Sequence, residues 1–210
     1  PEGSRTSKGR AIQNLINIEQ DDKVKAFICT KDLKDEDYIN KHYVIMATKK
    51  GQVKKTSLEK YSRPRVNGIN AITIKEGDEL LVAKLTNGES QIMMALKSGK
   101  AIRFEEAKTR PMGRSASGVR GIRLQHDKDE VVGMVSVNDM DSNILVVSSN
   151  GYGKRSKLED YRITNRGGKG VKTISITEKT GNLVSIKNVN DSNGLMIINK
   201  SGIAIRMAVK

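Results

Sequence analysis

The sequence has no tryptophan, one cysteine and two histidines, and only 3% of its 210 residues are aromatic. A single cysteine, Cys29, excludes a disulfide framework and a cysteine-based zinc site. His42 and His126 are too few and too far apart in the sequence to indicate a metal centre. No apolar run approaches the ~20 residues that cross a bilayer, so the sequence does not predict a membrane-spanning protein.

Catalytic signatures are also missing. The sequence contains no GxxxxGK[ST] phosphate-binding loop, no GxGxxG after a strand, no GxSxG elbow and no HExxH pair. The acidic clusters at 21–22 and 35–37 lie in predicted turns, where carboxylates are ordinarily solvated. The sequence therefore favours a binding protein with no catalysis and no cofactor of its own.

Positive charge is abundant by contrast, since 38 Lys and Arg against 24 Asp and Glu give a net charge of +14. An excess of this size sets up a field that attracts polyanions, and nucleic acid is the first candidate partner. Pro1 stands where an initiator methionine would, and no apolar core of a signal peptide follows it. We therefore expect a segment of a longer, cytoplasmic protein.

The sequence repeats itself about every 50 residues. Four short apolar runs each end in a landmark glycine, and the spacings between these glycines are 48, 52 and 51 residues. The landmark glycines are Gly51, Gly99, Gly151 and Gly202. A stretch of alternating apolar and polar residues, typical of a half-buried strand, follows each of the first three. These stretches are 68–74, 118–124 and 170–176.

Roughly four short strands per unit, separated by turn residues, predict an all-β fold. A ~50-residue period of four strands is typical of a propeller blade, which buries its apolar faces only when it stacks on neighbouring blades. We expect one domain over 1–210 with about four blades. Its repeats are 1–41 (partial), 42–90, 91–142, 143–193 and 194–210 (partial), with a charged insertion over 31–40.

The excess charge lies in one slot of the repeat. Windows from each of the first three landmark glycines to the following alternating stretch carry +6 (49–70), +5 (97–120) and +5 (149–172), whereas the other 140 residues total −2. Stacked blades would turn this slot into a basic belt that neutralises phosphates at regular intervals without reading bases. A solvated face that only confers solubility is the alternative, but solubility does not require seven basic residues in each window.

A basic residue also stands four positions after every landmark glycine, where it either contacts DNA or pairs with a neighbouring blade. These residues are Lys55, Arg103, Arg155 and Arg206. Tyr61 and Tyr161, each ten positions past a landmark glycine, fit packed corner residues better than stacking platforms. With seven aromatic residues in all, single-strand binding by base stacking is poorly supported.

A glycine-rich stretch, Asn-Arg-Gly-Gly-Lys-Gly at 165–170, combines backbone freedom with charge. Its glycines permit backbone angles closed to other residues and could bring N–H groups close to a phosphate, with Arg166 and Lys169 as charge. A tight turn between blades that needs glycine for steric reasons alone is the alternative. Degenerate counterparts occupy the same slot at 5–9, 63–68 and 114–118.

Together with the stretches 7–10, 112–124 and 151–155, this segment closely resembles the C-terminal domain of the DNA gyrase A protein. The resemblance covers essentially the whole chain, because separate motifs fall in the right order at the right repeat spacing. It implies a β-pinwheel, a propeller-like disc of about six blades whose positive rim wraps duplex DNA. It also implies ATP-dependent negative supercoiling with the rest of the gyrase A protein and with the gyrase B protein, in the nucleoid of a bacterial cytoplasm.

The family's signature box reads QRRGGKG. Residues 166–170 match its last five positions, whereas Thr164 and Asn165 stand in place of Gln and Arg. Because the full box belongs to the first blade in the family, we interpret this stretch as a degenerate copy in a later blade. Simple DNA binding does not depend on the missing residues.

The sequence therefore predicts binding of duplex DNA on the rim without base specificity. The predicted contacts are Lys54, Lys55, Arg63, Arg65, Arg103, Arg110, Arg114, Arg120, Lys154, Arg155, Arg166, Gly167, Gly168, Lys169, Gly170 and Arg206. Two alternatives stay open, the equivalent domain of topoisomerase IV and a basic propeller that binds an acidic protein.

Overall fold

The computed structural model describes residues 4, 6–9, 22–65 and 67–209 of the chain. Arg5 and much of the predicted partial repeat 1–41 therefore lie outside the described residues. Within the described part, regular structure consists of thirteen strands, one short α-helix and three 3₁₀ helices. The predicted all-β class is confirmed.

The strands are β1 (Tyr43–Thr48), β2 (Gln52–Ser57), β3 (Leu80–Thr86), β4 (Gln91–Leu96), β5 (Lys100–Glu105), β6 (Val119–Arg120), β7 (Val131–Val137), β8 (Asn143–Ser148), β9 (Gly153–Lys157), β10 (Val171–Lys172), β11 (Leu183–Val189), β12 (Gly194–Ile198) and β13 (Ala204–Ala208). The helices are α1 (Glu36–Lys41) and the 3₁₀ turns η2 (Leu58–Tyr61), η3 (Glu106–Lys108) and η4 (Leu158–Asp160).

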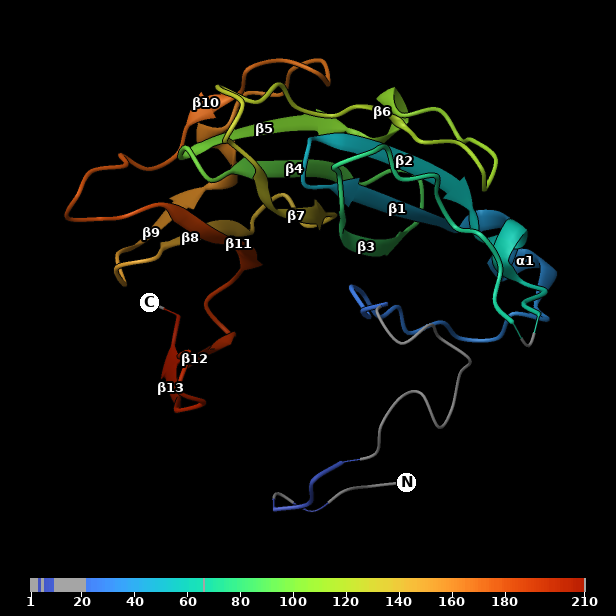
Figure 1. Ribbon diagram of the computed structural model, residues 1–210, viewed down its shortest axis with the longest axis horizontal. Coiled ribbons are helices and arrows are strands. Elements are labelled where there is room, and N and C mark those ends of the chain that lie inside the picture. The colour runs from blue at the N-terminus through green and yellow to red at the C-terminus, as the bar shows by residue number, and fades with distance from the viewer. Residues whose placement is uncertain (1–3, 5, 10–21, 66, 210) are drawn as a thin grey trace.

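These strands form three antiparallel sheets and a hairpin. The first sheet has the order β3-β1-β2-β6, the second β7-β4-β5-β10 and the third β11-β8-β9, while β12 and β13 pair only with each other. The sheets stand side by side in an arc, with β3, β7 and β11 on its concave side and β6 and β10 on its convex side (Figure 1). Each repeat thus supplies equivalent strands at equivalent positions in the arc.

The outermost strand of each four-stranded sheet comes from the next repeat. Val119 of β6 pairs with Val53 of β2, and Val171 of β10 pairs with Ala101 of β5. The alternating stretches predicted as strands therefore form strands of only two residues at 119–120 and 171–172, and no strand at 68–74. After two pairs the segment bends, as the N–H of Gly121 turns to the carbonyl of Gly51 (2.8 Å).

The core lies between the sheets. On β4, Ile92 and Met94 pack toward the first sheet, whereas Met93 and Ala95 pack toward the third, and all four are fully buried. A strand buried on both faces requires a continuous apolar run, and burial of each large side chain contributes ~1.5–3 kcal/mol. The apolar runs of the repeat are therefore the parts of the sequence that stack the blades.

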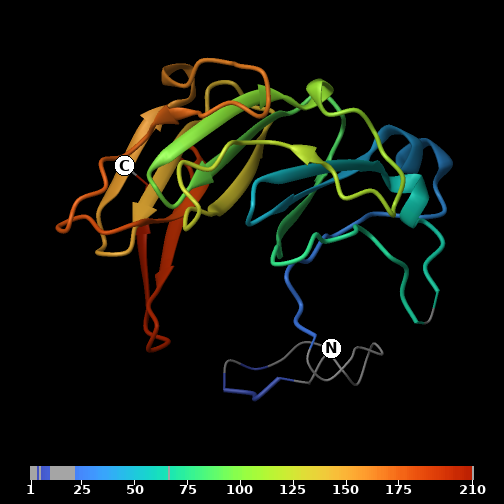
Figure 2. The same cartoon turned by 45° about the horizontal axis from the view of Figure 1, so that its top comes forward.

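Both ends of the described chain depart from this pattern. The predicted charged insertion at 31–40 contains all but the last residue of α1, whose N-cap Asp35 accepts a hydrogen bond from the backbone N–H of Tyr38 (3.1 Å). At the other end, the hairpin β12–β13 projects from the sheets (Figure 2) and leaves Met196 and Ile198 more than 60% exposed. An apolar run of the kind that is buried in β4 is thus exposed to solvent in the hairpin β12–β13.

Candidate nucleic-acid interface

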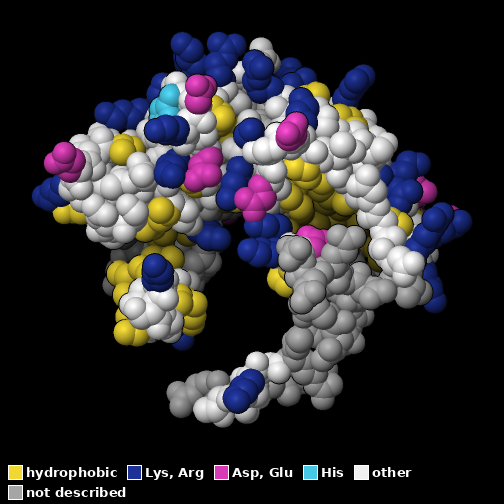
Figure 3. Space-filling model, viewed as in Figure 1, with side chains coloured by type: hydrophobic (Ala, Val, Ile, Leu, Met, Phe, Trp, Pro, Cys, Tyr) yellow, Lys and Arg dark blue, Asp and Glu magenta, His cyan; other side chains and the backbone are white. Residues whose placement is uncertain are grey.

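Lys and Arg side chains gather along the convex edge of the arc, over β5, β6, β10 and their connecting loops (Figure 3). This edge is where the loop after η3 and the loop after η4 meet. Because β6 and β10 each cross to the preceding sheet, they carry the charged segments of one repeat onto the edge of another. The placement of the charge thus follows from the exchange of strands.

Arg166 joins the two loops. Its Nε donates to the carbonyl of Lys108 (3.0 Å), and its Nη1 donates to the carbonyl of Arg120 (3.1 Å). Arg166 as a whole is half-buried, and the planar donors of its guanidinium span two backbone oxygens that belong to the preceding repeat. Arg166 therefore fixes the spacing of the basic residues on either side of it.

Two backbone hydrogen bonds also join these two segments, and we call the junction between them the seam. The N–H of Gly167 donates to the carbonyl of Gly121 (2.6 Å), and the N–H of Arg123 donates to the carbonyl of Gly168 (2.8 Å). These contacts bring five basic residues together, which we call the seam cluster. The seam cluster consists of Lys108, Arg120, Arg123, Arg166 and Lys169.

The seam cluster has the electrostatics of an anion-binding surface. All of its side chains except the half-buried Arg166 are exposed, and none forms an ion pair with a carboxylate of the described residues. Five cations without carboxylate partners create a positive potential that a polyanion can neutralise. This arrangement suits contact with a phosphate backbone, which displaces counterions and requires no base readout.

Other predicted contacts are spread along the arc. Arg63 and Arg65 are exposed on the loop after η2, a turn that packs against α1. Arg110 is exposed after η3, and Lys154 is exposed on β9 in the third sheet. Arg206 is exposed on β13. Lys154 also donates from its Nζ to the carbonyl of Thr173 (3.5 Å). The DNA contacts of these side chains stay predictions.

Lys54 was predicted as a DNA contact, and the structure shows that this was wrong. Its side chain is fully buried, and its Nζ donates to the carbonyls of Ala71 (2.6 Å) and Arg114, a predicted contact that is itself half-buried. Burial, with a smaller contribution from the nearby charge of Arg114, lowers the pKa of Lys54 to about 8. The ammonium group therefore joins the first repeat to the loop of the second and cannot reach a phosphate.

Lys55 is likewise buried and not available to DNA. Its Nζ lies 3.6 Å from the carboxylate of Glu106, whose oxygens also accept hydrogen bonds from Thr86 Oγ1 (2.6 Å) and the N–H of Ser90 (3.2 Å). The same ammonium stands over the ring of Tyr43, 4.7 Å from its centroid. The prediction of a phosphate contact is wrong, and the alternative, an ion pair with the neighbouring blade, is confirmed for Lys55.

Arg103 occupies the equivalent position in the next repeat and is also buried. Its Nη1 donates to the carbonyls of Leu158 (2.7 Å) and Tyr161 (2.9 Å), which belong to η4 and its C-cap. Burial lowers the pKa of the Arg103 guanidinium. The predicted DNA contact is wrong here too, because this position on β2 and β5 faces the next blade. Arg155, in the third sheet, is half-buried and paired with Asp191.

The glycine-rich stretch packs against the preceding sheet. A Cβ at Gly170, whose φ is +72°, would lie 2.6 Å from the carbonyl oxygen of Ala101. The N–H of Gly167 is already donated to Gly121, so it is not available to a phosphate. The steric alternative for these glycines is thus supported, and Gly167, Gly168 and Gly170 position the seam cluster through their backbone.

The two matched tyrosines are packed corner residues, as the sequence indicated. Tyr161 is buried, and its hydroxyl is hydrogen-bonded to Thr173 Oγ1. Tyr61 donates from its hydroxyl to the carbonyl of Ala71 (3.0 Å), and burial raises its pKa. Neither ring forms an exposed platform for base stacking.

Arg123 is the member of the seam cluster that sequence reasoning missed. It falls just outside the charged window of the second repeat, which ends at residue 120. One sequence feature could have identified Arg123, namely its position between two apolar residues. Ile122 is buried, and Leu124 packs against the same core. Arg123 lies exposed between these two residues.

The described residues hold no group of three or more His, Cys, Asp or Glu side chains placed to bind a metal ion. In the same part of the chain, no helix has the length and apolar character needed to cross a membrane.

The arc of exchanged four-stranded sheets with a basic convex edge defines the class of β-pinwheel domains. The family model described as "DNA gyrase C-terminal domain, beta-propeller" matches residues 1–31, 42–87, 91–138 and 142–190. The chain belongs to this family. It is 44% identical over its full length to the DNA gyrase A protein of Staphylococcus aureus strain NCTC 8325 / PS 47, of which it spans 23%.

Two solved structures share the fold. The C-terminal domain of DNA topoisomerase IV matches with a TM-score of 0.84 and 24% identity, covering 95% of this chain and 60% of that one. The DNA gyrase A C-terminal domain matches with a TM-score of 0.82 and 24% identity, covering 96% of this chain and 66% of that one. At this identity the likeness establishes the β-pinwheel fold, whereas the sequence comparison establishes the family.

Proposed function

We propose that the chain binds duplex DNA along its convex edge, without reading the base sequence. The observation that carries this proposal is the seam cluster, whose five cations share one edge and lack carboxylate partners in the described residues. Its members come from the end of η3, from loops and from a short edge strand, and the described surface offers no recognition helix that could enter a major groove. Phosphate contacts from such an edge position a duplex and are indifferent to sequence.

Within the parent protein, we propose that this binding wraps DNA and supports ATP-dependent negative supercoiling by a gyrase holoenzyme. The partners would be the rest of the gyrase A protein and the gyrase B protein, in a cytoplasmic, nucleoid-associated assembly. The 44% identity to a gyrase A protein favours gyrase over topoisomerase IV, for which the support is the fold alone. The chain itself would contribute no catalytic group and hold no cofactor.

Salt dependence tests the DNA contact. Each neutralised phosphate should contribute a slope of about −0.9 to log K against log [salt]. We expect a slope of about −4 to −5 on a random-sequence duplex, measured by fluorescence anisotropy between about 50 and 300 mM NaCl. A slope near zero, or a clear preference for an acidic protein over the duplex, would overturn the assignment in favour of the acidic-partner alternative.

A charge-matched pair of variants tests the location. The triple variant Arg120→Ala, Arg123→Ala, Lys169→Ala should reduce the slope by about 2 to 3 and weaken binding to all duplexes alike. The control variant Lys31→Ala, Lys34→Ala, Lys200→Ala removes the same charge from exposed sites elsewhere and should retain the slope. If both variants lose the same amount of slope and affinity, only the net charge of the chain matters. If the loss of affinity differs between duplex sequences, the protein reads bases.

A further inference from the structure

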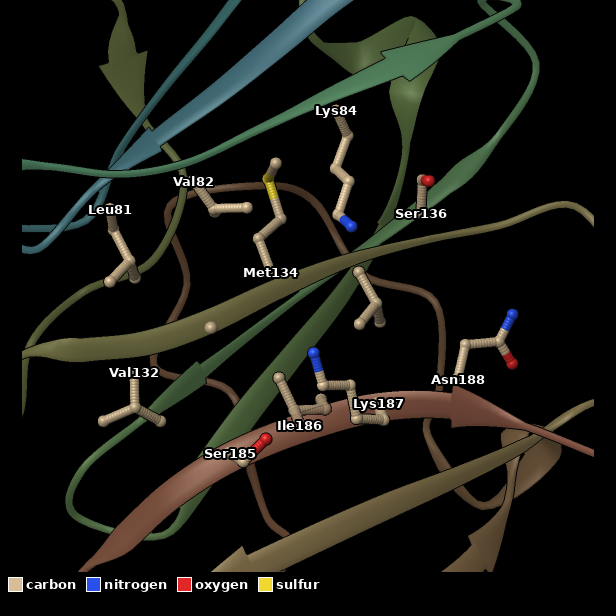
Figure 4. A pocket seen from close by; sticks show the side chains of 12 residues that line it. Leu81, Val82, Lys84, Val132, Met134, Ser136, Ser185, Ile186, Lys187 and Asn188 are labelled. Carbon is tan, nitrogen blue, oxygen red and sulfur yellow. The ribbon is translucent and has the colours of Figure 1, made fainter. Parts of the chain in front are cut away.

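A cavity of about 310 Å³ lies on the concave side of the arc, where the inner strands β3, β7 and β11 of the three sheets converge. Figure 4 shows Lys84 on β3 and Lys187 on β11 pointing into the same space from opposite sides, with Ser136 and Asn188 at one end. This inner-strand cavity is formed by strands other than those that carry the seam cluster. Its volume is at the lower end of the ~300–1,000 Å³ typical of small-molecule sites.

The two lysines occupy one position of the repeat. Lys84 pairs with Ile45 of β1, and Lys187 pairs with Leu145 of β8. The middle sheet has Val135 at this position, opposite Met93 of β4. An apolar strand thus separates two ammonium groups that share one hollow.

The polar groups of the cavity lack partners within the described chain. Neither Lys84 nor Lys187 forms an ion pair with a described carboxylate. The Oδ1 of Asn188 is buried without a hydrogen-bond partner, an arrangement that ordinarily costs free energy. A turn of the amide by about 180° would place its N–H donors where Oδ1 now lies.

These groups define the chemistry of a ligand. Ammonium groups only donate hydrogen bonds, and the Ser136 hydroxyl and the Asn188 amide can donate as well. Donors from opposite walls, beside Val82, Val132 and Ile186, suit a compact group with several acceptor oxygens and more than one negative charge. A cation would be repelled by both lysines.

We propose that the inner-strand cavity binds a small multivalent oxyanion of the phosphate class, of about the size of diphosphate. The bound anion neutralises two like charges and connects β3 to β11 across the second sheet. Because it binds the arranged arc and not the unfolded chain, it stabilises the relative position of the three sheets.

Titration with sodium diphosphate tests this site, with the full chain at an ionic strength held constant with NaCl and binding followed by calorimetry. We expect saturable binding of one diphosphate per chain and a rise in melting temperature. The double variant Lys84→Met, Lys187→Met keeps the aliphatic stems and should weaken binding by about tenfold or more. The control variant Lys34→Met, Lys200→Met removes the same charge from exposed sites outside the cavity and should bind within about twofold of the parent chain.

Equal weakening in both variants, or heats that never saturate, would overturn the proposal. Far-UV circular dichroism checks that both variants fold.

A second arm repeats the titration with duplex DNA bound, because a DNA phosphate has the same chemistry as the free anion. We expect diphosphate binding to persist and the duplex affinity of the cavity variant to be unchanged. If duplex displaces diphosphate, the cavity is not a site separate from the DNA-binding surface, and the proposal is overturned. If only the variant Arg120→Ala, Arg123→Ala, Lys169→Ala loses duplex binding, the proposed diphosphate site is unaffected.

Discussion

At the scale of single residues, basic side chains at different positions of the repeat lie in opposite environments. Lys55 and Arg103 lie between blades, where they contact the carboxylate of Glu106 or the carbonyls of η4 and its C-cap. Arg120 and Lys169 lie on the convex edge in solvent. A buried charge is tolerated only with such partners, so the residues of the first kind stabilise the stack and are unavailable to DNA.

Replacement of Lys55 separates these two roles. The variant Lys55→Met leaves the Glu106 carboxylate buried and unpaired, so the free energy of unfolding in urea should fall by about 3 kcal/mol. Adding Glu106→Gln should recover part of this loss, because a neutral amide keeps contacts with Thr86 and Ser90. The duplex affinity of the folded variant should stay within about twofold of the parent chain, since no exposed charge is removed. A tenfold loss of affinity at full folding would contradict the inter-blade role.

At the scale of elements, each of the two four-stranded sheets is completed by a strand of two residues from the next repeat. That strand can approach only if the residue before it has no side chain, as at Gly170, which packs on the carbonyl of Ala101. The equivalent glycine of the first repeat, Gly68, has the same φ of +72° but no atom within 4 Å of a built Cβ. The two glycines therefore share a backbone requirement and differ in packing.

Alanine at these two positions distinguishes backbone strain from close approach. Gly68→Ala should cost about 1–2 kcal/mol of the free energy of unfolding through its left-handed backbone alone. Gly170→Ala should cost about 2 kcal/mol more, because the methyl group forces β10 away from β5. Both values are measured by urea denaturation monitored by circular dichroism. If both substitutions lower the free energy of unfolding by the same amount, β10 can move away from β5 without loss of stability. Pairing of β10 with the preceding sheet would then contribute little to stability.

At the scale of the whole molecule, the three sheets form an arc whose basic edge is convex. A duplex that follows such an edge must bend, and bending a 20–30 bp site by 40–90° costs about 1–6 kcal/mol. Phosphate contacts spread along the arc can offset this cost, whereas contacts at one point cannot. On the proposed function, the curvature of the arc would therefore couple DNA binding to a change in DNA shape.

Ligation of nicked circles measures that change. Circles sealed with the chain bound should acquire a nonzero linking difference relative to circles sealed alone. The variant Arg120→Ala, Arg123→Ala, Lys169→Ala should lose it, whereas Lys31→Ala, Lys34→Ala, Lys200→Ala should retain it. A linking difference of zero under conditions of saturated binding would limit the function of this chain to DNA binding without wrapping.

Much of the fold could be read from the sequence, but the site could be read only in part. The apolar runs and landmark glycines predicted the strands of the repeat, because each run needs a partner on both faces. Three residues of the run Val53-Lys54-Lys55-Thr56 are polar, yet all four are buried. Net charge per window does not say which side of a strand a lysine occupies, and the buried lysines were therefore counted with the exposed ones.

The sequence by itself determined the repeat, the all-β class, the family and the excess of positive charge. These depend on composition and spacing, which are properties of the chain alone. Only the tertiary structure decided which cations are exposed on the convex edge and which join blades, because that choice depends on strands that cross between repeats. Residues 120, 123, 166 and 169 became neighbours through that exchange, and β3 and β11 brought together Lys84 and Lys187, which are far apart along the chain.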